Sequence, residues 1–85
     1  MKPVVVYTAP SCPYCVRAKE LLKRRNIPFQ EILIGWDDEN GWREAERRSG
    51  MKTMPQVFID GKIVGGYTEL AAADASGELA KLLAS

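Results

Sequence analysis

The chain has 85 residues, of which 46% are hydrophobic and 27% are charged. A chain of this length forms one small hydrophobic core, so we expect a single domain over residues 1–85. Its 12 basic and 11 acidic residues give a formal net charge of +1, too small to indicate a nucleic-acid partner or an anionic membrane surface. The apolar runs are too short for a membrane span or a secretory signal, so we expect a cytoplasmic protein.

The first half of the chain predicts a strand, a helix and a second strand. Val4–Tyr7 is a short β-branched run typical of a buried strand. Apolar residues at three- and four-residue spacing then predict a helix over residues 13–25, in which Pro13 suits the first turn. After a break at Asn26–Pro28, residues 29–34 predict a second strand.

The second half predicts a helix, a hairpin and a final helical region. In chain order we expect a polar loop over 35–41, a helix over 41–49 ended by Gly50, strands at 56–59 and 63–64, and a helical region from Thr68 onward with an interruption at 76–77. Asp60–Gly61 between the two apolar runs is a strong hairpin signal. The order β-α-β-α-β-β-α predicts an α/β fold, with helices on both faces of a mixed four-stranded sheet.

The two cysteines of the chain, Cys12 and Cys15, lie where the first strand gives way to the first helix. Two intervening residues place both sulfur atoms near the first helical turn, and the N–H groups of that turn stabilise a thiolate on Cys12. Cys15 lies one turn further, on the apolar face. The pair predicts redox chemistry with Cys12 as nucleophile and Cys15 as resolving thiol, and the plainer alternative is two small buried apolar side chains.

A metal site is not expected. A structural zinc site normally takes four ligands, drawn mainly from cysteine and histidine. The chain has two cysteines and no histidine. A metal ion would therefore need carboxylates, a second copy of the chain or an external thiol.

Four segments resemble a dithiol glutaredoxin of the C-P-Y-C type, bacterial-like and within the thioredoxin superfamily. They are Cys12–Lys19, Arg48–Gly50, Thr53–Ile59 and Gly65–Leu70. The resemblance extends over nearly the whole chain. It implies a thioredoxin-like fold, a cis bond before Pro55, and glutathione as the reductant with no bound cofactor.

The resemblance also implies a glutathione-binding site. Its residues here are Tyr14, Thr53, Met54, Pro55, Gly66, Tyr67 and Thr68. The backbone of Met54 is expected to pair with an extended disulfide substrate, as an added strand does. The helix start at Gly66–Thr68 suits the γ-glutamyl carboxylate of glutathione. Two plainer readings are a Pro55 that only begins a strand and a Thr68 that only caps a helix.

Four positions depart from the family pattern: Ala9 and Trp42, and also Thr68 and Glu69, where the family often has an aspartate or serine and an aspartate. Many glutaredoxins have a lysine where this chain has Ala9, and often an arginine or glutamine where it has Trp42; both hold the glycine carboxylate of glutathione. Arg43, Lys52 and Arg47 are the candidate replacements, and the spacing does not decide between them. Trp36 and Trp42 are interpreted either as packing at the edge of the core or as a stacking surface for a protein substrate.

We therefore expect an enzyme, a monomeric glutathione-disulfide oxidoreductase. It would remove glutathione from protein mixed disulfides and reduce protein disulfides, and the resemblance allows ribonucleotide reductase as a partner. One alternative is a thioredoxin-like redoxin recharged by a flavoprotein reductase. Another is an iron–sulfur carrier, in which two chains share a cluster through Cys12 and two glutathiones, although Pro13 argues against it.

Overall fold

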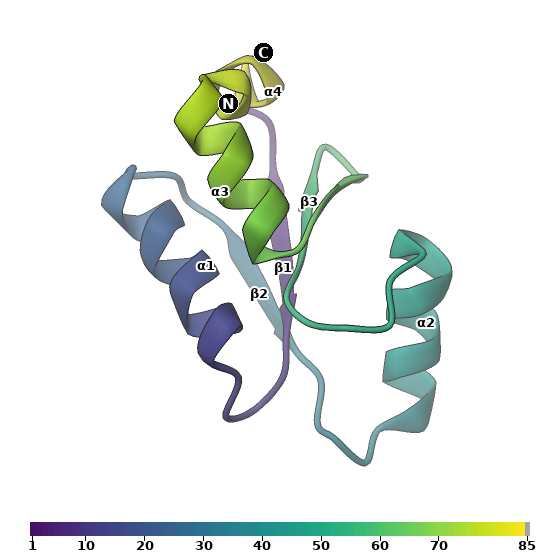
Figure 1. The fold of residues 1–85 in the computed structure, drawn as a ribbon. Coiled ribbons are helices and arrows are strands. Elements are labelled where there is room, and N and C mark those ends of the chain that lie inside the picture. Colours follow the sequence, from purple (N-terminus) through teal and green to yellow (C-terminus); the bar gives the residue numbers. More distant parts are fainter. Residues whose placement is uncertain (85) are drawn as a thin grey trace.

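The computed structural model, which describes residues 1–84, has a mixed four-stranded sheet at its centre (Figure 1). The strands are β1 (Val4–Thr8), β2 (Gln30–Leu33), β3 (Gln56–Ile59) and β4 (Lys62–Gly65), in the sheet order β2-β1-β3-β4. β1 runs parallel to β2 and antiparallel to β3, and β3 pairs with β4 in a hairpin. The predicted mixed sheet is therefore confirmed.

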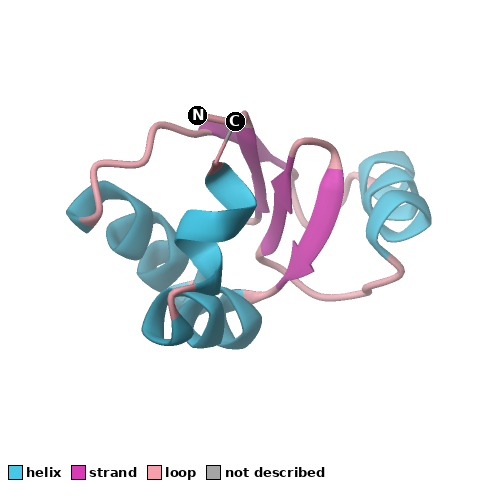
Figure 2. Ribbon diagram, turned by 90° about the horizontal axis from the view of Figure 1, so that it is seen from above, coloured by secondary structure: helices cyan, strands magenta, loops and turns pink. Residues whose placement is uncertain are grey.

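The helices cover both faces of this sheet. They are α1 (Pro13–Arg24), α2 (Glu39–Ser49), α3 (Tyr67–Ser76) and α4 (Glu78–Leu83). Figure 2 shows α2 alone on one side of the sheet and the other three helices on the opposite side. The predicted break in the last helical region is confirmed, because Gly77 has a left-handed φ of 84° and separates α3 from α4.

Two apolar clusters fill the spaces between the layers. Val6 of β1 belongs to the larger cluster, with Leu22 of α1 and Leu70 of α3, and all three are fully buried. Tyr7, the next residue of β1, belongs to the smaller cluster with Ala45 of α2. Successive residues of a strand point to opposite faces, so β1 anchors both layers. The larger cluster fixes α1, and with it the position of the first turn of α1.

Two helices begin earlier than the sequence predicts. Helix α2 begins at Glu39 rather than at residue 41, because the carboxylate of Asp38 accepts the N–H of Gly41 at 2.9 Å and caps the helix. Helix α3 begins at Tyr67 with Gly66 at the capping position. The expectation that Thr68 caps this helix is therefore wrong.

The cause of the early start of α3 is a side chain that reaches back along the chain. The Glu69 carboxylate accepts the N–H of Gly66 at 2.7 Å. This is the acidic half of a capping box, and a glycine takes the place of the usual serine or threonine.

The hairpin turn has the predicted sequence and geometry. Asp60 and Gly61 both have positive φ, 54° and 78°, as a type I′ turn requires. Strand β2 is one residue shorter at each end than predicted. It lies at the edge of the sheet and pairs only with residues 5–8 of β1.

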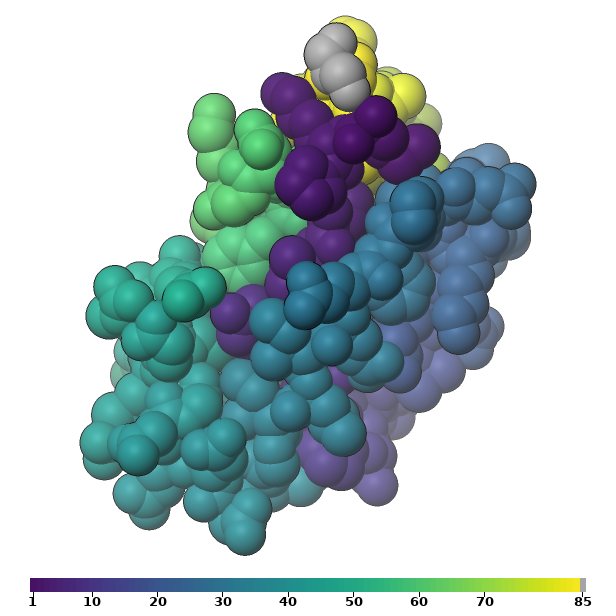
Figure 3. Space-filling view, turned by 180° about the vertical axis from the view of Figure 1, so that it is seen from behind, coloured from purple at the N-terminus to yellow at the C-terminus, as the bar shows by residue number. Residues whose placement is uncertain are grey.

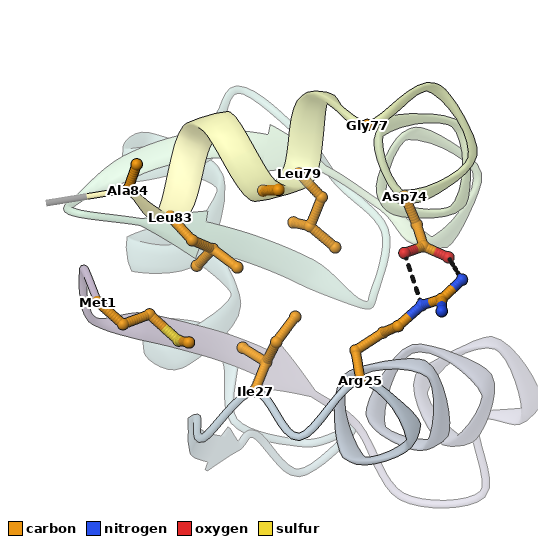
Figure 4. A pocket seen from close by; sticks show the side chains of 9 residues that line it. Met1, Arg25, Ile27, Asp74, Gly77, Leu79, Leu83 and Ala84 are labelled. Carbon is orange, nitrogen blue, oxygen red and sulfur yellow. Dashed lines mark hydrogen bonds and ion pairs between the residues drawn. The ribbon is translucent and has the colours of Figure 1, made fainter.

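The two chain ends lie together, opposite the first turn of α1. The N–H of Lys2 donates to the carbonyl of Leu83 at 3.0 Å, and Figure 3 shows the N-terminal residues beside α4. A hollow of about 470 Å³ at this end is shown in Figure 4, with the guanidinium of Arg25 paired to Asp74 at 2.9 and 3.0 Å on its rim. Among residues 1–84, no helix is long and apolar enough to cross a membrane.

The packing of α1 yields a stability prediction. Leu22→Ala leaves a cavity at a fully buried position, so the free energy of unfolding should fall by about 2–5 kcal/mol in urea titrations. Leu33→Ala is the matched control, since Leu33 is 61% exposed and its truncation should change stability by roughly 0.5 kcal/mol or less. Equal losses in the two variants would contradict the assignment of Leu22 to the core that fixes α1.

Candidate active site

The start of α1 gives the two cysteines different surroundings. Cys12 is the residue before the helix, has an extended backbone and is partly exposed. Its sulfur accepts the backbone N–H of Cys15 at 3.2 Å. Cys15 is 2% exposed and lies on the face of α1 that packs against the core. The expected difference between an accessible outer thiol and a buried inner thiol is found, and both are free thiols.

Burial sets the ionisation of the inner thiol. Burial first, and then the hydrogen bond and charge of Cys12, together raise the pKa of Cys15 to about 12. The backbone of Ala9 and the charge of Lys19 act in the opposite direction. Cys15 is therefore a neutral thiol at physiological pH, and thiolate chemistry begins at Cys12.

A charged network one helical turn after Cys15 holds Lys19 in place. Its ammonium lies 3.0 Å from the Glu31 carboxylate, which also accepts the hydroxyl of buried Thr8 at 2.7 Å. These two hydrogen bonds, from Thr8 first and Lys19 second, lower the pKa of Glu31. The sequence does not predict this network, although Lys19 is four residues after Cys15, a spacing that places two side chains on the same helix face.

The Met54–Pro55 segment lies opposite Cys12. The Met54–Pro55 bond is cis, as the family resemblance implies. The thiol of Cys12 points to the carbonyl of Met54, with a distance of 3.8 Å between sulfur and oxygen. The side-chain amide of Gln56 donates to the carbonyls of Met51 and Thr53, at 3.0 and 3.1 Å, and so orders the loop before Pro55.

A groove of about 320 Å³ brings together all seven residues predicted for glutathione binding. Its lining consists of Tyr14, Met51, Thr53, Met54, Pro55, Gly66, Tyr67, Thr68 and Glu69. Met51 and Glu69 were outside the predicted set. The lining comes from three segments far apart in the sequence: the start of α1, the loop before β3 and the start of α3.

Aromatic rings from two helices flank this groove. The rings of Tyr14 and Tyr67 lie 6.0 Å apart, and the Arg17 guanidinium lies 5.1 Å from the centre of the Tyr14 ring. Tyr14 is 53% exposed, so its ring is available to a ligand in the groove. A phenol ring offers both an apolar face and a hydrogen-bonding group.

The candidate basic residues lie outside the lining of the groove. Arg43 is on α2 with its side chain 74% exposed, 3.7 Å from the Glu39 carboxylate. Lys52 is exposed and stands one residue before Thr53, which does line the groove. Ala9 is 5% exposed, so its methyl group is covered.

No metal-binding cluster accompanies the thiols. Within residues 1–84, no group of three or more histidine, cysteine, aspartate or glutamate side chains is placed to hold a metal ion. The described residues can carry out thiol–disulfide exchange. The accessible sulfur of Cys12 and the buried sulfur of Cys15, one turn away, would react with the disulfide of a substrate bound along Met54.

Comparisons with known proteins agree with this site. Residues 4–64 match the family model named Glutaredoxin. The chain is 46% identical over 85 residues to Glutaredoxin 3 of Escherichia coli K12, and the match covers 98% of this chain and 99% of that protein.

Solved glutaredoxin structures share the fold. The solution structure of glutaredoxin from Brucella melitensis has a TM-score of 0.84 and 43% identity, covering 98% of this chain and 89% of that one. The buckwheat glutaredoxin–glutathione complex has a TM-score of 0.86 and 30% identity, covering 96% and 76%. With the C-P-Y-C dithiol at the start of α1 and the thioredoxin-like fold around it, the chain belongs to the glutaredoxin family and is a thiol–disulfide oxidoreductase.

Proposed function

We propose that this oxidoreductase uses glutathione, and that it acts in the cytoplasm as a monomer. Its substrates are protein–glutathione mixed disulfides and protein disulfides, and ribonucleotide reductase is one partner of that kind. The observation that carries the proposal is a groove lined by residues from three segments, among them Met54, whose carbonyl faces the thiol of Cys12. The buckwheat relative, described in complex with glutathione, supports it.

The start of α3 suits the γ-glutamyl end of glutathione. The N–H groups of the first helical turn, at Tyr67 and Thr68, have no intrahelical partners and attract a carboxylate. The Glu69 carboxylate beside them is bound to the N–H of Gly66 and complements the ammonium group of the same γ-glutamyl unit. The two N–H groups thus suit the carboxylate of the γ-glutamyl unit, and the Glu69 carboxylate suits its ammonium group.

The middle and the far end of glutathione have different partners. The N–H and C=O of Met54 suit the backbone of the cysteinyl residue, which places its sulfur against Sγ of Cys12. For the glycine carboxylate we assign Lys52, because it adjoins Thr53 in the lining. Arg43 is set aside, since it is on α2 and does not line the groove.

In each proposed exchange reaction, one thiolate attacks a disulfide sulfur and another thiolate leaves. The Cys12 thiolate attacks the glutathione sulfur of a mixed disulfide, and the protein thiolate leaves and takes up a proton. A second glutathione thiolate then attacks the bound glutathione sulfur, which forms glutathione disulfide and releases the Cys12 thiolate. With a protein disulfide, the Cys12 thiolate attacks one protein sulfur and the other leaves as a thiolate and takes up a proton. Cys15 then loses its proton and attacks Sγ of Cys12, which releases the first protein sulfur as a thiolate that takes up a proton and leaves the Cys12–Cys15 disulfide.

The surroundings of Cys15 determine when it becomes reactive during the reduction of a protein disulfide. In the reduced protein the hydrogen bond and charge of Cys12 both raise the pKa of Cys15. Once Cys12 is in a mixed disulfide, its sulfur carries no charge, and only burial still holds the Cys15 thiol neutral. The pKa of Cys15 therefore falls at the stage where its attack is needed.

The direct test of glutathione dependence is a coupled assay with glutathione, glutathione reductase and NADPH on hydroxyethyl disulfide. Oxidation of NADPH that requires both the protein and glutathione is the expected result. Turnover with a flavoprotein thioredoxin reductase, but none with glutathione, would establish the redoxin alternative instead.

The first prediction separates the two thiols. Cys12→Ser should abolish every activity, because the attacking sulfur is lost. Cys15→Ser should still remove glutathione from a glutathionylated peptide, which needs one thiol, and should lose at least tenfold on a protein disulfide. Rates on the two substrates, measured side by side, check this, and a Cys12→Ser protein that retained activity would show that the nucleophile is misassigned.

The second prediction concerns pH. A pKa raised to about 12 keeps Cys15 protonated across the neutral and mildly basic range, and only a thiolate reacts with iodoacetamide. Between pH 7 and pH 9, the reduced protein should therefore be alkylated once, at Cys12, as read by peptide mass spectrometry.

Two controls accompany the alkylation experiment. In urea, both thiols should react, because burial is lost. In Cys12→Ser, which removes the thiolate charge of Cys12, Cys15 should begin to react at lower pH than in the parent chain. Labelling of Cys15 at pH 8 at the rate of a free cysteine would contradict the burial argument.

A further inference from the structure

Two tryptophans form an exposed stack next to the active-site loop. The rings of Trp36 and Trp42 lie 5.2 Å apart with 21° between their planes. Trp42 packs against the smaller core cluster, whereas Trp36 is 62% exposed. Tryptophan is enriched among the residues that dominate protein interfaces, and a large exposed ring on a fixed support is the form that such residues take.

Hydrogen bonds fix both rings in place. The indole N–H of Trp36 donates to the carbonyl of Pro10 at 2.8 Å, and that of Trp42 to the carbonyl of Gly35 at 2.9 Å. Each ring therefore has its polar group satisfied, and the face of Trp36 turned away from Trp42 remains as an apolar, electron-rich surface. A platform already ordered in the free protein costs little conformational entropy when a partner binds.

The platform lies close to the reactive sulfur. Pro10 is two residues before Cys12, so the two Cα atoms are at most about 7.6 Å apart. The N–H of Ile34 also donates to the carbonyl of Thr8 at 2.8 Å, which ties the segment before Trp36 to the strand end that leads into this loop. Figure 1 shows the loops before α1 and before α2 at the same end of the molecule.

The surroundings of the platform are acidic. A hollow of about 300 Å³ is lined by Trp36, Glu39 and Trp42, and none of these lines the groove at Tyr14 and Tyr67. The stretch between the two tryptophans has three carboxylates, at positions 37, 38 and 39, and no basic residue.

One cation already lies near this hollow. Arg43 is 3.7 Å from Glu39, with side-chain exposures of 74% and 84%. A pair so exposed to water contributes little and opens freely, so Glu39 is available to another cation. The Asp38 carboxylate is engaged in capping α2.

Aromatic faces beside a carboxylate attract a cation and repel an anion. An ammonium or guanidinium group over an indole ring is bound by the ring's electrons, and a nearby carboxylate adds to that attraction. A free carboxylate placed here would meet the Glu39 charge and no donor from the indoles. The hollow therefore fits a lysine or arginine side chain.

We propose that Trp36, Trp42 and Glu39 form a docking surface for a lysine or arginine side chain of the disulfide-bearing polypeptide, a few residues from its reactive cysteine. The proposal rests on the proposed reduction of protein disulfides and names a substrate class for it. While the cation is held at this surface, the substrate disulfide lies against Cys12. Cys12 then attacks one substrate sulfur and Cys15 resolves the mixed disulfide, giving the reduced peptide and the Cys12–Cys15 disulfide.

The test compares two peptides, each cyclised by a disulfide. They are identical except at one position, two residues from a cysteine, which is lysine in one peptide and glutamine in the other. Prereduced protein in excess is mixed with each peptide at low salt, quenched with acid, and the reduced peptide is measured by chromatography. The expected ratio of second-order rate constants, lysine over glutamine, is about three- to thirtyfold. The ratio should fall at 0.5 M salt, since the charges are exposed.

Matched variants locate the effect. Glu39→Gln keeps the shape of the side chain and should reduce the ratio severalfold, and Trp36→Ala should bring it close to one. Asp60→Asn is the control, because it removes an acidic residue in the β3–β4 turn, at the end of the molecule with the chain termini, and should leave the ratio unchanged. Urea titration shows whether Trp36→Ala remains folded, and Glu39→Gln tests the charge independently of that.

The outcomes separate the two proposals. If hydroxyethyl disulfide is reduced with glutathione but the two peptides react alike within twofold, the docking surface is wrong and the proposed function stands. A peptide preference that persists in both Glu39→Gln and Trp36→Ala also overturns the docking surface. If neither hydroxyethyl disulfide nor the peptides are reduced, the proposed function itself fails, and the docking proposal fails with it.

Discussion

The hydrogen bond from the backbone N–H of Cys15 to the sulfur of Cys12 ties the redox chemistry to the fold. It forms because α1 begins at Pro13, directly after Cys12, which leaves the N–H groups of the first turn without intrahelical acceptors. The helix is held at that position by Leu22, which is fully buried against the sheet. A shift of the first turn would therefore require the larger core cluster to repack, so the core sets the geometry at the sulfur.

The same helix start makes the two thiols unequal. A three-residue separation carries the chain from the helix cap to the inward face, so Cys12 meets solvent and Cys15 meets the core. Burial then raises the pKa of Cys15, and the charge of Cys12 opposes a second negative charge nearby. Which sulfur attacks first thus follows from the position of each on one helical turn. The Lys19–Glu31 pair moderates this effect, since the ammonium favours the Cys15 thiolate when it forms.

The order of elements was predictable because its signals are local. The Asp60–Gly61 turn, the β-branched run of β1 and the spacing of apolar residues in α1 each depend on a few neighbouring residues. The starts of α2 and α3 were missed for a different reason. There a side chain, Asp38 or Glu69, bonds to a backbone N–H three residues away and extends the helix beyond its apolar pattern.

Some parts of the site could be predicted from local sequence, and others could not. The dithiol follows from the spacing of its two cysteines, whereas the groove residues came from the family resemblance, because no local pattern joins Thr53 to Gly66. The Thr8–Glu31–Lys19 network joins two strands and a helix, so it needs the register of β1 against β2, which the sequence does not encode locally. The stack of Trp36 on Trp42 likewise depends on how the loop before α2 folds back.

The tryptophan at position 42 changes which ligands are favoured on the α2 side of the site. A basic residue there would attract a carboxylate, whereas an indole beside the Glu39 carboxylate attracts a cation and donates no hydrogen bond to an anion, because its N–H is already bonded. Specificity is a difference between two affinities. A tryptophan in place of a basic residue lowers the affinity for a glycine carboxylate and raises the affinity for a cationic side chain, so this one substitution changes both affinities. The proposed site for the γ-glutamyl end is unaffected, because its donors belong to the first turn of α3 and Trp42 is on α2. Under the proposed function, the balance between glutathione and polypeptide binding can therefore change on the α2 side of Cys12 while the dithiol and the groove stay as they are.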